Sequence, residues 1–309
     1  MYQELKKYGK VKLNEPMSKH TTFKIGGPAR YFIIVDNIEN LINLLKFLDG
    51  EGVNRFVLGG GSNLLFSDSE FDGVVVKIKN SGFEIEETAI KVEAGMPLAQ
   101  LLALTMKNEL TGLEWASGVP GTVGGAVRGN AGAMGADASQ SLKKVTIYRD
   151  GEVIDLDVED CEYAYRESIF KNNDDIILSA YFQFKKGKKQ EVVQKVQEYL
   201  SYRTGRFPAF PSGGSFFKNL PISAWTGEQS ELPEKFVQVG KLGVAWLIDQ
   251  AGMKGVEVGG AKVSDEHANF VVNFNNATQS DVLKLVEKVK EAVYNKYRIE
   301  LEEEVQIIN

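Results

Sequence analysis

Apolar residues along the 309-residue chain fall into short continuous runs and into longer stretches with helical spacing. Strands are predicted from the runs at 30–35, 74–78, 83–85, 90–92, 145–148, 153–156, 176–184, 269–274 and 299–308. Helices are predicted where apolar positions recur every three or four residues, at 38–48, 190–202, 244–250 and 279–297, and after a first-turn proline at 97–107. The glycine-rich stretch 112–135 is expected to be almost entirely loop.

The order of these elements predicts the fold class. Strands and helices are interspersed without a regular βαβ rhythm, and Asp150-Gly151 is a strong hairpin signal. Both features favour an α+β fold with antiparallel or mixed sheets over a doubly wound parallel fold. A break near 190–210 divides the chain into two expected domains, 1–200 and 201–309.

Composition excludes several classes of protein. Cys161 is the single cysteine, which rules out an intrachain disulfide and fits a reducing compartment. No apolar run approaches the ~18 residues of a membrane span, and the polar N-terminus does not resemble a signal peptide, so we expect a soluble, cytoplasmic protein. The net charge of −6 argues against a nucleic-acid partner. With only His20 and His267 beside one cysteine, no zinc cluster is expected, and nothing points to a magnesium site.

Glycine is the outlier in composition, with 31 residues in the chain. Two segments are especially rich in it, 59–63 (GGGSN) and 118–133 (GVPGTVGGAVRGNAGA). Neither segment fits the dinucleotide fingerprint of Rossmann folds or the P-loop. Glycine lets a ligand approach the backbone, and successive N–H groups form a nest for an anion such as a diphosphate. Ser62 and Asn63 add side-chain donors. A single cluster would be read as tight turns, but two clusters favour a bound nucleotide.

The segment 165–168 (YRES) presents an arginine between two aromatic-rich strands. The planar fork of Arg166 suits a carboxylate or a phosphate. The alternative is a surface ion pair with Glu167 or Glu162, which is the commoner role of an arginine.

Two further segments, 211–219 and 301–305, contain polar residues that could take part in chemistry. In 211–219 (PSGGSFFKN), two glycines present Ser215 on a tight turn, followed by the cation of Lys218 and the amide of Asn219. A serine in this setting is more often a turn residue than a catalyst. The segment 301–305 (LEEEV) is most simply an acidic, solvated edge strand.

Taken together, these segments resemble the UDP-N-acetylenolpyruvoylglucosamine reductase (MurB) family in its shorter type II form. The match follows the family's order over nearly the whole chain, at 20–29, 57–68, 117–133, 165–170, 211–219, 247–273 and 301–305. The resemblance implies an FAD-binding domain of the vanillyl-alcohol-oxidase type, made of two subdomains split near residue 78, and a C-terminal α/β substrate domain. The absence of an insertion after Asn219 indicates type II.

The resemblance also implies an activity. NADPH would reduce a non-covalently bound FAD, and UDP-N-acetylglucosamine enolpyruvate would then be reduced to UDP-N-acetylmuramate for peptidoglycan synthesis. Arg166 matches the family arginine that binds the substrate carboxylate and stabilises the enolate, Ser215 the proton donor, and Glu304 the glutamate that orients the carboxylate. The implied FAD contacts are Gly60, Gly61, Ser62, Asn63, Gly124, Gly125 and Asn130. Lys218 and Asn219 are assigned to the substrate, and a monomer is expected.

The chain departs from the family pattern at two positions. Gln306 stands where many relatives have an arginine, and Met134 stands where many have a tyrosine. If the arginine contacts flavin, that contact is missing or replaced here. The role of His267 is open between a core hydrogen bond and a substrate contact. Two other functions remain: a flavin oxidase or dehydrogenase acting on another alcohol, and an inactive UDP-sugar-binding module.

Overall fold

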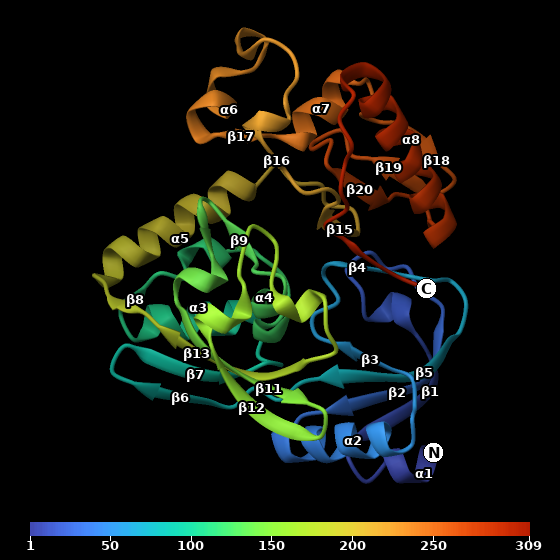
Figure 1. The fold of residues 1–309 in the computed structure, drawn as a ribbon, viewed down its shortest axis with the longest axis vertical. Helices are drawn as coiled ribbons and strands as arrows, with labels where there is room; N and C mark the ends of the chain where they lie inside the picture. Colours follow the sequence, from blue (N-terminus) through green and yellow to red (C-terminus); the bar gives the residue numbers. More distant parts are fainter. The chain divides into compact units, whose positions relative to one another are not determined.

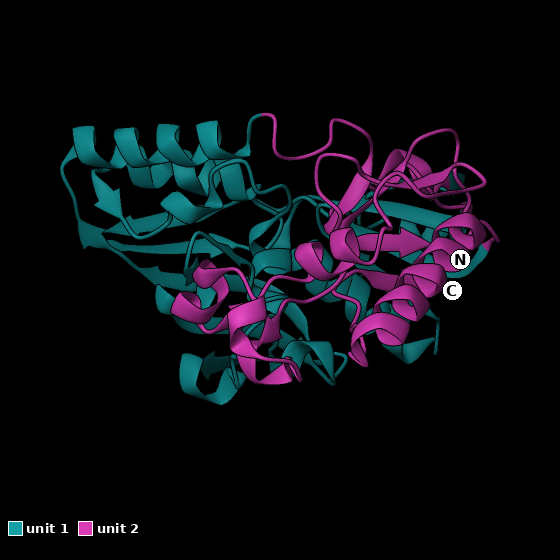
Figure 2. Cartoon of the chain, turned by 90° about the horizontal axis from the view of Figure 1, so that it is seen from above, with its two compact units in different colours: residues 1–15, 29–61, 71–204 teal, residues 16–28, 62–70, 205–309 magenta.

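The computed structural model describes all residues from Met1 to Asn309 and divides them into two compact units. The first unit contains residues 1–15, 29–61 and 71–204, and the second contains 16–28, 62–70 and 205–309 (Figure 2). Both units are therefore discontinuous in sequence. Two short segments from the N-terminal third of the chain fold with the C-terminal part.

The first unit begins with a four-stranded sheet in the order β1-β2-β5-β3. Its strands are β1 (Lys10–Pro16), β2 (Pro28–Val35), β5 (Phe71–Ile78) and β3 (Arg55–Leu58). The strand β5 pairs in parallel with both β2 and β3. The helix α2 (Ile38–Gly50) covers one face, where its leucines pack on Val74, Val76 and Ile78 of β5 (Figure 1). The strands β2 and β3, which α2 connects, therefore run parallel, with β5 between them.

A five-stranded antiparallel sheet forms the rest of this unit, in the order β12-β11-β13-β7-β6. Its strands are β6 (Phe83–Glu86), β7 (Ala89–Glu93), β11 (Leu142–Arg149), β12 (Glu152–Asp157) and β13 (Ile176–Gln183). The predicted hairpin is confirmed, because Arg149 pairs with Glu152 across Asp150 and Gly151, and both turn residues have positive φ angles of 49° and 86°.

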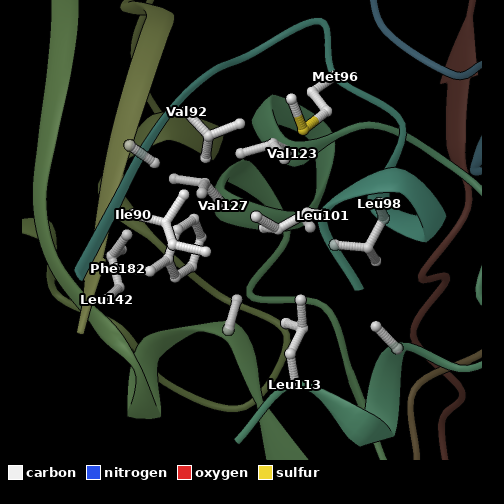
Figure 3. Close-up of a cluster of buried hydrophobic side chains, with 14 of the residues drawn as sticks. Ile90, Val92, Met96, Leu98, Leu101, Leu113, Val123, Val127, Leu142 and Phe182 are labelled. Atoms are coloured by element: carbon white, nitrogen blue, oxygen red, sulfur yellow. The ribbon is translucent and has the colours of Figure 1, made fainter. Parts of the chain in front are cut away.

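Three helices accompany this sheet: α3 (Leu98–Lys107), α4 (Val123–Arg128) and α5 (Lys189–Arg203). Apolar side chains from α3 and α4 meet those of β7, β11 and β13 in one core (Figure 3). Leu101 and Val127, at the centre of that core, are fully buried. The helix α4 corrects the expectation of loop throughout 112–135. It forms despite two glycines because Val123, Ala126 and Val127 share one buried face.

The small strands of the first unit pair locally. β8 (Leu110–Thr111) pairs with β14 (Lys185–Lys186), and β9 (Gly132–Ala133) pairs with β10 (Ala136–Asp137). A short helix, α1 (Tyr2–Leu5), opens the chain and buries Leu5. These pairings close the loops that connect the larger elements.

The second unit is built on an antiparallel sheet in the order β15-β20-β19-β18. The strands are β15 (Ser212–Ser215), β18 (Glu257–Val258), β19 (Ala261–Val263) and β20 (Phe270–Asn273). The helices are α6 (Glu234–Val239), α7 (Val244–Gln250) and α8 (Gln279–Tyr297), and β16 (Leu220–Pro221) pairs with β17 (Lys241–Leu242). The helix predicted at 279–297 is confirmed as α8, and its valine and leucine stripe joins the unit's core.

The chain ends in a strand that is much shorter than predicted. Only β21 (Gln306–Ile308) is regular strand, and it pairs in parallel with β4 (Leu64–Phe66). Residues 299–305 were expected to continue the strand, but they make a single isolated bridge, between Glu303 and Phe217. No helix of the structure is both long enough and apolar enough to span a bilayer.

Candidate active site

The two glycine-rich segments meet within the first unit, backbone against backbone. A Cβ atom placed on Gly60 would lie 2.5 Å from the Cα of Gly121. A Cβ atom on Gly59 would lie 2.6 Å from the Thr122 hydroxyl oxygen. No side chain fits at these positions, so the approach of the turn at 59–61 to the turn at 121–122 requires glycine. Glycine-rich backbone of this kind suits the diphosphate of a dinucleotide such as FAD, because a ligand can approach its N–H groups closely.

The start of α4 explains the next glycines. The backbone N–H of Gly124 donates to the Ala94 carbonyl at 2.9 Å, and that of Gly125 donates to the Thr122 hydroxyl at 3.4 Å. A Cβ atom on Gly124 would lie 2.9 Å from the Ala94 Cβ. Gly124 therefore allows close packing of α4, and its amide is already bonded within the protein. Its role as an FAD contact remains a prediction.

Asn130 ties the second glycine-rich segment to the segment that carries Arg166. The side chain of Asn130 is buried, donates to the Ala164 carbonyl at 2.9 Å and accepts from the Ser139 N–H at 3.1 Å. Arg166 has a φ of 59°, and its Nη2 donates to the Gly132 carbonyl at 2.7 Å. The structure thus brings Arg166 beside the second glycine-rich segment, within the first unit.

The neighbour of that arginine has its own partner. Glu167 pairs with Lys171 at 3.2 Å, and the Lys171 ammonium also donates to the Arg166 carbonyl at 2.5 Å. The Arg166 guanidinium lies 5.2 Å from the centre of the Tyr165 ring, as in a cation–π contact. Two independent contacts therefore fix the backbone and the head group of Arg166.

Ser215 ends β15 in the second unit, where it pairs with Phe270 of β20. The preceding Gly214 has a φ of 87°, which a glycine adopts without strain. Asn269, which is 3% exposed, holds the chain just beyond the serine, because its side chain accepts from the Phe217 N–H at 3.0 Å and donates to the Phe217 carbonyl at 2.8 Å. Asn269 was not singled out in the sequence, where nothing distinguishes it from any other polar residue at the start of a predicted strand.

The segment 301–305 (LEEEV) lies alongside the segment that follows Ser215. The Glu304 N–H donates to the Phe216 carbonyl at 2.7 Å, and the Lys218 N–H donates to the Glu302 carbonyl at 2.9 Å. The carbonyl of Glu304 accepts from the Asn63 side-chain amide at 2.9 Å. Ser215 and Glu304 are therefore brought together by strand-like pairing within the second unit, and both backbone polar groups of Glu304 are bonded. The interpretation of LEEEV as a simple solvated edge is wrong.

The residues around this pair have partners of their own. The Lys218 ammonium pairs with the Glu302 carboxylate, and the Asn219 side-chain oxygen accepts from the Val244 N–H at 3.0 Å where α7 begins. The Gln306 N–H donates to the Asn63 carbonyl at 3.0 Å. Asn63 therefore joins the first glycine motif to the C-terminal segment. The assignments of Lys218 and Asn219 to substrate, and of Asn63 and Ser62 to FAD, remain predictions.

His267 belongs to the packing of the second unit. Its Nδ1 accepts from the Asn269 N–H at 3.3 Å, and its ring lies 4.9 Å from that of Phe270 and 5.6 Å from that of Phe207. Burial lowers the pKa of His267, which keeps the ring neutral and able to accept that hydrogen bond. Between the two roles left open, these contacts favour the core hydrogen bond. No group of three or more histidine, cysteine or acidic residues is arranged to hold a metal ion.

Arg166 and the paired glycine turns belong to the first unit, and Ser215, Asn63 and Glu304 belong to the second.

The sequence analysis did not identify Lys77 as a site residue. Its ammonium donates to the Gly59 carbonyl at the base of the first glycine turn. A signal for it exists, because this lysine interrupts the apolar run at 74–78.

Comparison with known proteins agrees with this architecture. A family model described as an FAD binding domain matches residues 29–157, and one described as the C-terminal domain of UDP-N-acetylenolpyruvoylglucosamine reductase matches residues 207–308. A crystal structure of the reductase from Thermus caldophilus superposes with a TM-score of 0.77 and 29% identity, covering 97% of this chain and 99% of that one. The fold and the matched domains define an FAD-binding reductase of the α+β class.

Relatives of known name identify the family. The UDP-N-acetylenolpyruvoylglucosamine reductase of Anoxybacillus flavithermus is 40% identical over 306 residues, which cover 97% of this chain and 95% of the relative. That of Halalkalibacterium halodurans is 38% identical over 304 residues, with the same coverage. The chain belongs to the UDP-N-acetylenolpyruvoylglucosamine reductase family. The predicted resemblance and fold class are thereby confirmed.

Proposed function

We propose that this enzyme uses NADPH and a non-covalently bound FAD to reduce UDP-N-acetylglucosamine enolpyruvate to UDP-N-acetylmuramate, a step in peptidoglycan precursor synthesis. The observation that carries the proposal is the pairing of the Ser215 segment with the Glu304 segment, through the 2.7 Å bond from the Glu304 N–H to the Phe216 carbonyl. This pairing supports the proposal because it brings a segment with a hydroxyl group and a segment with a carboxylate side by side within the second unit. The paired glycine turns support the presence of a dinucleotide.

The reaction adds a hydride and a proton across the enol ether double bond, and negative charge develops toward the substrate carboxylate. FAD, when bound, would supply the hydride. Arg166 offers a planar fork for the carboxylate and stabilises the developing charge. The Ser215 hydroxyl delivers a proton to the carbon beside the carboxylate. Glu304 orients the substrate carboxylate.

A hydroxyl is a weak acid, so its position matters more than its acidity. Ser215 is fixed by its pairing with Phe270, and the following backbone is fixed by Asn269 on one side and by the Glu304 N–H on the other. A rigid support of this kind holds a catalytic group within reach of one substrate atom. The arrangement supports a proton donor better than an ordinary turn serine.

Spectroscopy of the purified protein tests the proposal. We expect a yellow protein whose colour is released completely on denaturation, is bleached by NADPH, and is restored when the enolpyruvyl substrate is added. Ser215→Ala is expected to leave bleaching by NADPH unchanged and to slow the substrate-dependent recovery at least 100-fold. The matched control is Ser212→Ala at the other end of β15, which should recover at the normal rate.

Glu304→Gln is the second variant, with Glu303→Gln as its control because Glu303 pairs with Lys290. We expect the first to lose turnover and the second to keep it. Bleaching of the oxidised flavin by an alcohol, with no NADPH present, would support the oxidase alternative. Substrate binding without NADPH consumption would support the binding module.

A further inference from the structure

Lys77 occupies an unusual place for a charged side chain. It lies near the carboxyl end of β5, an inner strand of the four-stranded sheet, between Ile34 of β2 and Leu58 of β3. Because side chains alternate along a strand, Lys77 points away from the face on which Val76 and Ile78 pack against α2. The other face of this sheet therefore carries a half-buried cation.

The position of Lys77 relates it to the glycine turns. Its ammonium donates to the carbonyl of Gly59, the residue that follows β3. The next residue, Gly60, is the one whose backbone meets Gly121. Ligands of sheets with parallel strands bind at the carboxyl ends of the strands, and β3 and β5 are parallel and end here.

No acidic side chain neutralises Lys77. The Gly59 carbonyl is its one hydrogen-bond partner, and the charged group that acts on it is a second cation, Lys79. The facing positions of the adjacent strands are Ile34 and Leu58, which carry no charge. Burial, with a smaller contribution from Lys79, lowers the pKa of Lys77 to about 8. A half-buried cation with no counter-charge is unfavourable unless a ligand supplies the anion.

The ammonium group has three donors, and the Gly59 carbonyl takes one of them. We propose that Lys77 is the counter-cation for the diphosphate of the dinucleotide bound at the paired glycine turns. A lysine serves such a site as a point charge, and the backbone N–H groups of glycine-rich turns can supply further donors to the phosphate oxygens. This inference rests on the proposed binding of FAD.

A consequence follows for the pH dependence of binding. An anion beside Lys77 raises its pKa, so the complex holds a proton that the free protein loses above pH 8. Affinity for FAD should therefore fall as the pH rises above about 8, by up to about tenfold per pH unit. Well below pH 8 the lysine is already charged in the free protein, and it contributes no pH dependence there.

FAD titration of the flavin-free full-length protein tests the proposal, with binding followed by the change in flavin fluorescence. We expect Lys77→Met to weaken FAD binding about 10- to 100-fold at pH 7, as for loss of one hydrogen bond to a charged group. Lys77→Met should leave affinity for riboflavin, which has no phosphate, unchanged. Lys79→Met, which removes the neighbouring exposed cation, should change FAD affinity less than threefold.

Lys77→Arg separates a charge role from a purely structural one. An arginine stays protonated across the accessible range, so this variant should bind FAD within about tenfold of wild type and should lose the decline above pH 8. If Lys77 only supported the Gly59 carbonyl, wild type would show no such decline. A flat wild-type profile from pH 7 to 10 would therefore overturn the proposal.

The outcomes also separate this inference from the proposed function. Wild-type protein that binds FAD, with Lys77→Met binding it equally well, would refute the role of Lys77 and leave the function intact. Wild-type protein that binds no FAD would refute the function itself. If Lys77→Met does not fold, the pH profiles of wild type and Lys77→Arg still decide the question.

Discussion

Gly60→Ala is the sharpest test of the paired glycine turns. The added methyl group would lie 2.5 Å from the Gly121 Cα and 3.1 Å from its carbonyl carbon, against an ordinary carbon–carbon separation of about 3.5–4.0 Å. One turn must therefore move by about 1 Å. Gly60 has no positive φ, so backbone strain adds nothing and the whole effect comes from this contact.

Overpacking of this kind costs about 1–3 kcal/mol when the surroundings resist. If the turns stay together, the free energy of unfolding falls by that amount. If they separate instead, the amides move away from the diphosphate, and we expect FAD affinity to fall about 5- to 100-fold, the same free energy expressed in binding. Urea unfolding of the flavin-free protein and FAD titration measure the two quantities, and their sum should lie near 1–3 kcal/mol.

Gly50→Ala is the control for this experiment. Gly50 is the last residue of α2, and a Cβ atom there would have no neighbour within 4 Å. Alanine should leave FAD binding unchanged and stabilise the protein by up to about 1 kcal/mol, because it is the better helix former. Wild-type stability together with wild-type FAD affinity in Gly60→Ala would refute the reasoning that the turns are in obligatory contact.

Substitutions at two residues and one pH titration test the supports of the fold, all followed by urea unfolding. Asn269→Ala removes both hydrogen bonds to the chain after β15 and should cost about 2–4 kcal/mol, and Asn269→Asp should be milder at low pH. Asp175→Ala breaks a two-bond ion pair with Arg149, of 2.7 and 2.6 Å, and should cost about 2–4 kcal/mol. The backbone hydrogen bond from Thr278 lowers the pKa of Asp281, so its capping contribution of about 1 kcal/mol is present at pH 7 and lost as the pH falls below the usual carboxyl range.

Local signals predicted the elements whose stability depends on local pattern. The helix α8 has a continuous apolar stripe and a capping box at Thr278 and Asp281, so both its face and its start are encoded in nearby residues. The hairpin at Asp150 and Gly151 is encoded in the same way. In contrast, α4 was missed because its glycines, which permit packing on Ala94, are also the residues that signal a loop.

Features that depend on distant partners were not accessible from the sequence. The segment 299–305 has a strand-like composition, but its hydrogen bonds go to Phe216 and Asn63 and leave only one isolated bridge. Likewise, β4 and β21 pair across more than 240 residues. No periodicity within either segment identifies its partner, which is why the discontinuous units could not be predicted.

Hydrogen bonds to distant partners also separate residues that a family motif groups together. In GGGSN the glycines and the asparagine were carried over as one set of flavin contacts, yet they have separate local reasons to be present. Gly60 is needed for the approach of Gly121, whereas Asn63 holds the Glu304 carbonyl and accepts from Gln306. A substitution of Asn63 therefore disturbs the proposed catalytic carboxylate before any loss of flavin contact is considered. A motif match assigns a segment to a function, but only the hydrogen bonds show which part of the function each residue serves.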